Sequence, residues 1–175
     1  MSNSIPASFA SNSSVVTTGP NGQRAHHQQF VHMERLAEGF HQVTDKVWCQ
    51  VGNGLSNQTF VEGPEGLIVI DTGESIEEMN AALSAIRECC SAPIAAVIYT
   101  HYHYCSGTQA VFDEQKTELP IWGHYGIEKN LQTMATEISP TGGRGLVHQF
   151  SMLLPDEGPD SSASVGLGLY YRRPE

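Results

Sequence analysis

Two histidines and a cysteine alternate along the stretch "THYHYCSG", just after a run of apolar residues. His101, His103 and Cys105 are each separated by one residue. In an extended chain, alternate residues point to the same side, so two imidazoles and one thiol would share a face. Nitrogen and sulfur donors of these types suit zinc. The spacing therefore predicts a metal site formed by His101, His103 and Cys105.

Other interpretations of the same residues stay open. Two histidines at this spacing also occur without a metal, and a histidine at the end of a strand can simply bond a backbone carbonyl. Tyr102 and Tyr104 would face the opposite way and are predicted to pack against the protein. A thiol beside two imidazoles could also have a lowered pKa and act as a redox sensor.

A strand, a helix and a second strand are predicted to position these residues. Residues 67–70 are apolar at every position, which predicts a strand covered on both faces, entered from a hairpin at 63–66. Ser75 and Glu78 have the spacing of a capping box at the start of a helix. That helix has apolar residues at helical spacing, namely Ile76, Met79, Ala82, Leu83 and Ile86. The run "PIAAVIYT" predicts the second strand, and its carboxyl end is where α/β proteins bind small molecules.

The chain divides into three parts by composition. Residues 1–29 are rich in Ser, Asn and Gln without an apolar period, and we expect a disordered leader there, including its solvated pair His26 and His27. Residues 30–150 are expected to form one domain, in which "GTQAVFDEQ" and "GIEKNLQTMATEI" predict helices and "LPIWGH" a short strand. Residues 151–175 are expected to be an irregular tail.

The charge balance argues against several partners. Acidic residues outnumber basic ones 19 to 9 and give a formal charge of −10. Nucleic acid and anionic membrane surfaces need clustered cations, so neither is expected as a partner. No apolar run approaches the roughly 20 residues that span a bilayer, and no signal peptide is visible. We expect a cytoplasmic protein with reduced cysteines, because Cys89 and Cys90 are adjacent and the four cysteines form no disulfide framework.

The order of the motifs resembles the metallo-β-lactamase superfamily. The segment "NQTFVEGPEGLIVIDTG" is similar to that family's strand pair ending in an Asp-x-Gly turn. After a helix, "AAVIYTHYHYCSGT" stands where the family has Thr-His-x-His-x-Asp-His-x-Gly-Gly. The similarity covers about residues 47–126. Within the superfamily, the sequence looks most like the alkyl sulfatase branch, whose members cleave sulfate esters of long-chain alcohols.

The resemblance implies roles for single residues. His101 and His103 match the first two metal ligands, and Asp71 matches an Asp that supports the metal loop without being a ligand. Cys105 and Ser106 depart from the pattern, because the family has a ligating Asp and a ligating His there. Both departures fall on the second metal. His124 and His148 match no motif and are expected to be structural or surface residues.

The implied fold is α+β, a four-layer αββα sandwich, of which only the first half is expected here. A single sheet would leave an apolar face open, so we expect self-association or a partner chain to cover it. The hypothesis that follows is an amino-terminal part of a longer enzyme. The implied function is a zinc-dependent hydrolase of small-molecule sulfate or carboxylic esters, acting through a zinc-bound hydroxide. The alternative is a degenerate or truncated, non-catalytic member that acts as a binding or assembly module.

Overall fold

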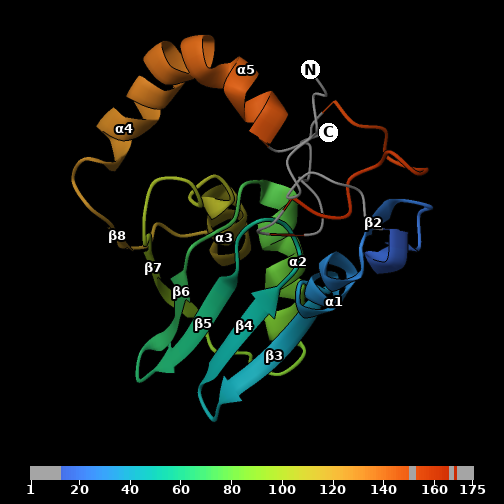
Figure 1. The fold of residues 1–175 in the computed structure, drawn as a ribbon. Helices are drawn as coiled ribbons and strands as arrows, with labels where there is room; N and C mark the ends of the chain where they lie inside the picture. Colours follow the sequence, from blue (N-terminus) through green and yellow to red (C-terminus); the bar gives the residue numbers. More distant parts are fainter. Residues whose placement is uncertain (1–12, 150–152, 166–167, 169–175) are drawn as a thin grey trace.

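A six-stranded sheet with helices on one face forms the centre of the molecule (Figure 1). The computed structural model describes residues 13–149, 153–165 and 168. The strands follow the chain order across the sheet. They are β3 (Gly39–Thr44), β4 (Val47–Val51), β5 (Gln58–Gly63), β6 (Gly66–Ile70), β7 (Ile94–Ile98) and β8 (Ile121–Trp122). The first four pair antiparallel, whereas β7 joins β6 and β8 joins β7 in parallel.

Helix α2 (Ile76–Arg87) connects β6 to its parallel neighbour β7 and confirms the predicted strand–helix–strand unit. The Ser75 hydroxyl accepts a hydrogen bond from the Glu78 backbone N–H at 3.2 Å, as a capping box requires. The Glu78 carboxylate accepts from the backbone N–H of Glu74 at 3.0 Å, one residue before the expected partner. Helix α3 (Thr108–Gln115) follows β7, and the predicted hairpin joins β5 to β6.

The core lies between one face of the sheet and helices α2 and α3. Phe60, Leu67 and Val69 from the sheet are fully buried, and they pack with Met79 and Ile86 of α2. Burial alternates along β6, so Ile68 and Ile70 remain partly exposed. The prediction that residues 67–70 are covered on both faces is therefore wrong for the described residues, because only the helix-covered face is buried. An all-apolar strand sequence does not by itself predict whether the second face of the strand is covered.

The amino-terminal segment differs from its expectation as a disordered leader, whereas residues 153–165 contain turns and bends only. Residues 13–29 contain the short η2 helix (Ser13–Val15), a hairpin of β1 (Val16–Thr18) with β2 (Arg24–His26), and the start of α1 (His27–Arg35). The hairpin meets the segment 153–165, because the Arg24 N–H donates to the Pro159 carbonyl at 3.1 Å. That contact is distant in sequence, so composition alone did not indicate it. The rest of the expected leader, residues 1–12, lies outside the described residues.

A long helical segment follows β8. It consists of α4 (Ile127–Thr133), a π-helical turn η3 (Met134–Ile138) and α5 (Ser139–Gln149). The π-helical turn stands just before Pro140, whose missing N–H interrupts the regular bonding of an α-helix. This segment arcs past the ends of the strands in Figure 1. Within the described part of the chain, no helix is long and apolar enough to cross a membrane.

Candidate functional site

The turn after β6, residues 71–73, forms the support of the candidate site, and we refer to it as the Asp71 turn. The Asp71 N–H donates to the Ile98 carbonyl at 2.9 Å, which joins the carboxyl ends of β6 and β7. Its carboxylate accepts from the Thr100 N–H at 2.9 Å and from the Thr100 hydroxyl at 2.6 Å. Asp71 therefore supports the segment that carries the histidines and does not point to solvent as a free ligand.

Residues 101–106, the histidine loop, follow β7 and are bonded to the Asp71 turn through backbone groups. The Thr72 N–H donates to the Tyr104 carbonyl at 2.8 Å, and the Ser106 N–H donates to the Gly73 carbonyl at 3.2 Å. A side chain on Gly107 would lie 2.0 Å from the Thr72 carbonyl oxygen, so glycine is needed for this close approach. The chain is not extended through the loop, because β7 ends at Ile98 and residues 101–104 form bends. The predicted alternation of side chains therefore does not apply there.

His101 and His103 lie side by side on the exposed surface of the loop. Their ring centroids are 5.1 Å apart, and His101 also contacts the ring of Tyr104 at 4.8 Å. The Thr100 hydroxyl lies 2.8 Å from His101 Nδ1. Because the hydroxyl hydrogen points to Asp71, the oxygen is left to accept from Nδ1–H, and His101 Nε2 keeps a free lone pair. Burial and the neighbouring His101 lower the pKa of His103. Both imidazoles can thus act as nitrogen donors.

Cys105 does not join the two imidazoles. Its thiol donates to the Tyr102 carbonyl at 3.0 Å, within the loop itself. Burial raises the pKa of the Cys105 thiol, and the charge of Asp71 raises it further. A reactive or metal-binding cysteine needs the thiolate, so this environment disfavours the redox-sensor interpretation.

The donors that the structure describes do not fit a complete zinc site. Zinc in proteins takes three or four protein ligands. Among residues 13–149, 153–165 and 168, no three His, Cys, Asp or Glu side chains are grouped so that they could hold a metal ion. The loop brings His101 and His103 together and leaves Cys105 and the exposed Ser106 out of the pair. The ligand set predicted from the sequence was His101, His103 and Cys105. His101 and His103 stay predicted ligands of a partial metal site, whereas the Cys105 thiol does not lie with them.

A buried polar cluster lies behind the Asp71 turn, and sequence reasoning missed it. Glu78 is fully buried at the start of α2, and a side chain on Gly54 or Gly73 would collide with its carboxylate. Burial, and then the charge of Glu78, raises the pKa of Glu74 to about 7. Asn53, also fully buried, donates from its amide to the Glu78 carbonyl at 2.8 Å. The capping-box spacing indicated the helix start, but it gave no sign of this burial.

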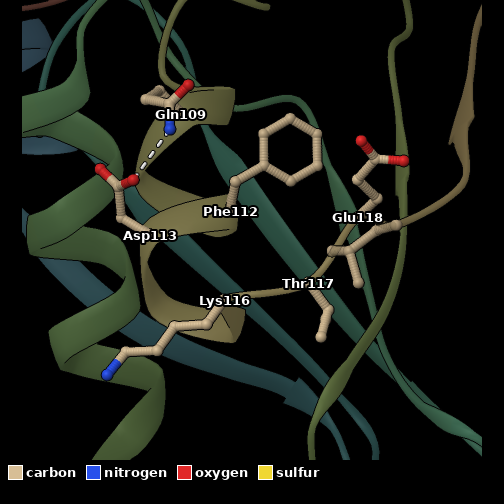
Figure 2. A pocket seen from close by; sticks show the side chains of 7 residues that line it. Gln109, Phe112, Asp113, Lys116, Thr117 and Glu118 are labelled. Carbon is tan, nitrogen blue, oxygen red and sulfur yellow. Dashed lines mark hydrogen bonds between the residues drawn. The ribbon is translucent and has the colours of Figure 1, made fainter.

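The described pockets lie elsewhere. Figure 2 shows an open pocket of about 540 Å³ beside α3, in which Gln109 donates to Asp113 at 2.8 Å. It is lined by Gln109, Phe112, Asp113, Lys116, Thr117, Glu118 and Leu119. Only Phe112 and Leu119 are apolar, so this pocket lacks the long apolar groove that an alkyl chain would need. None of the predicted metal ligands lines it.

Comparison with known proteins agrees with the arrangement of these elements. The pattern of the metallo-beta-lactamase superfamily matches residues 51–104, which run from the last residue of β4 into the histidine loop and end before Cys105. This segment is similar to that superfamily, and the described residues form one sheet and one helical layer of a metallo-β-lactamase-like fold.

Several proteins to which the chain is similar are alkyl sulfatases. A linear primary-alkylsulfatase from Pseudomonas sp. (strain ATCC 19151) is 31% identical over 112 residues, covering 61% of this chain and 21% of the relative. An alkyl/aryl-sulfatase from Saccharomyces cerevisiae is 30% identical, covering 66% of this chain and 19% of the relative. The solved structure of a double mutant of the sec-alkyl sulfatase PisA1 has a TM-score of 0.65 and 25% identity, covering 77% of this chain and 22% of that one. The chain thus spans about a fifth of the length of these relatives.

Proposed function

We propose that the chain is part of an alkyl sulfatase-like, metal-dependent hydrolase of sulfate or carboxylic esters, to which it contributes His101 and His103 as zinc ligands. The hydrogen-bonded series Asp71–Thr100–His101 carries this proposal, because it orients one imidazole and leaves its Nε2 free. A carboxylate that orients a histidine through its second ring nitrogen is a common support of metal sites. The similarity to alkyl sulfatases supports the ester class.

Two imidazoles do not complete a zinc site, so further donors must come from outside the described residues. A catalytic zinc needs three protein ligands and one position for water. We therefore derive no hydrolytic step from this loop alone, and the activity is proposed for the assembled site. The role of the described residues is to hold the first two nitrogen donors at the carboxyl end of β7.

The test is elemental analysis of the assembled enzyme that contains this chain, together with sulfate release from a medium-chain alkyl sulfate. We expect zinc in the wild type and at least a tenfold loss in the variant His101→Ala/His103→Ala. His148→Ala is the matched control, because His148 is an exposed histidine in α5 and should leave the zinc content unchanged. Equal zinc in all three proteins, or none in the wild type, contradicts the proposal. Sulfate release that is independent of zinc would contradict its metal-dependent form.

The second candidate function is a binding or assembly module without catalysis. The observation that favours it is the second face of the sheet, where Val61, Ile68 and Ala96 stand side by side in register and are all partly exposed. An apolar face of this kind is normally covered. A second copy of the chain is the occupant to test first, by sedimentation of the wild type beside Ile68→Glu. A dimer that the substitution dissociates supports this candidate, and a monomeric wild type at high concentration contradicts it.

A further inference from the structure

Cys105 occupies the position where a metal-binding loop of this family pattern has its acidic ligand, yet its side chain is engaged within the loop. The thiol donates to the carbonyl oxygen of Tyr102, three residues earlier, at 3.0 Å. A bond between residues i and i+3 closes a turn. The Cys105 carbonyl is also engaged, because it accepts from the Thr108 hydroxyl at 3.0 Å. Cys105 thus connects the turn to the first residue of α3.

The residues on both sides of Cys105 are bonded to the Asp71 turn. Tyr104 accepts from the Thr72 N–H, and the Ser106 N–H donates to Gly73, which itself pairs with Cys105 as an isolated bridge. These bonds hold the backbone of Cys105 in place. The two imidazoles lie on the exposed surface and contact tyrosine rings, whereas Cys105 is half-buried. Among the described residues, no three His, Cys, Asp or Glu side chains are grouped so that they could hold one metal ion, so the sulfur does not share a site with the imidazole pair.

We infer that Cys105 closes the turn of the histidine loop and is not a metal ligand, so that this loop offers two imidazole donors and no third. The part of the inference that concerns metal binding rests on the proposed function. The turn-closing role of Cys105 does not depend on it. The inference removes Cys105 from the ligand set that the spacing of the sequence predicts. It also assigns the residue a structural role that a hydroxyl could fill and a methyl group could not.

Cobalt(II) is the probe, because a cobalt–thiolate bond produces a charge-transfer absorption that imidazole ligands do not. We expect the cobalt spectra of the wild type and Cys105→Ser to coincide and their cobalt affinities to agree within about twofold. Because serine can donate the same hydrogen bond, Cys105→Ser should keep the melting temperature of the wild type. Cys105→Ala should lower it by roughly 2–4 °C, the shift expected for the loss of one hydrogen bond in a chain of this size.

A thiolate band in the wild type that disappears in Cys105→Ser, with at least a tenfold loss of cobalt affinity, would overturn the inference. That result would leave the proposed function standing, because the site would then have a third donor. If the wild type binds no cobalt at all, the proposed function fails, and the melting temperatures of Cys105→Ser and Cys105→Ala alone decide the role of Cys105. If His101→Ala/His103→Ala abolishes binding and Cys105→Ser does not, both are supported. Equal melting temperatures of Cys105→Ser and Cys105→Ala would contradict the turn-closing role.

Discussion

The Asp71 turn and the histidine loop lie against each other, but they differ in how far they keep the superfamily pattern. The turn has its Asp and Gly, and its bonds to the loop run between backbone groups, apart from the Thr72 hydroxyl, which donates to the Tyr104 carbonyl at 3.3 Å. The loop keeps two histidines and has Cys105 and Ser106 in place of two ligands. Backbone bonds do not depend on side-chain identity, so the shape of a metal loop can persist while its ligand set changes. The comparison predicts that stability depends on the turn and metal affinity on the loop.

Gly107→Ala should have the largest effect on stability. The new Cβ would lie 2.0 Å from the Thr72 carbonyl oxygen and 2.6 Å from that of Ser75, so the turn and the start of α3 would have to separate. We expect the free energy of unfolding to fall by about 3 kcal/mol, the upper end for overpacking. Denaturant unfolding measures it. Gly145→Ala is the control, because nothing lies within 4 Å of its Cβ position and alanine favours the helix. Similar results for the two would refute the close contact.

Asp71→Ala should cost about 2 kcal/mol, because it removes two bonds to Thr100 and places alanine at a backbone φ of 59°. Asp71→Asn should cost less, since asparagine tolerates this left-handed conformation and keeps one acceptor oxygen. Thermal and denaturant unfolding of the two variants test the order. If alanine is tolerated as well as asparagine, Asp71 does not hold the loop.

Glu74→Gln should change the pH dependence of stability. Burial and Glu78 raise the folded-state pKa of Glu74 from 4.5 to about 7, so the folded state binds the proton more tightly than the unfolded state does. The unfolding free energy of the wild type should therefore fall as the pH rises from about 4.5 to about 7 and stay low above that. We expect glutamine to remove this decline and to stabilise the protein at pH 8 by roughly 1 kcal/mol. The effect is this small because the side chain is only half-buried and solvent screens its charge. Parallel pH profiles for the two proteins would contradict the assignment.

His101→Ala and His103→Ala should have the smallest effect on folding. Both side chains are exposed, and each variant should change the unfolding free energy by less than about 0.5 kcal/mol. The same substitutions are expected to reduce metal binding. Thermal unfolding measured by calorimetry, together with a metal titration, therefore separates the contribution of the histidines to stability from their contribution to metal binding. A loss above about 1 kcal/mol in the melt would mean that the histidines are part of the structural support.

Much of the fold was predictable because its signals are local. The spacing of Ile76, Met79 and Leu83 predicted helix α2, and the capping pair predicted where it begins. The glycines at positions 63 and 66 predicted the hairpin of β5 and β6. Coverage of the second sheet face and the hairpin at residues 16–26 were not predictable, because both depend on contacts between residues far apart in the sequence.

The candidate site divides in the same way. The order of the Asp-x-Gly turn, the helix and the two histidines is written in the sequence, and it was sufficient to indicate the superfamily and the position of the loop. The direction of the Cys105 thiol and the free Nε2 of His101 were decided by the tertiary structure. The physical reason is that spacing predicts side-chain direction only where the backbone is regular. In this loop the backbone bends, and its shape depends on bonds to Asp71, Thr72 and Gly73, about thirty residues earlier.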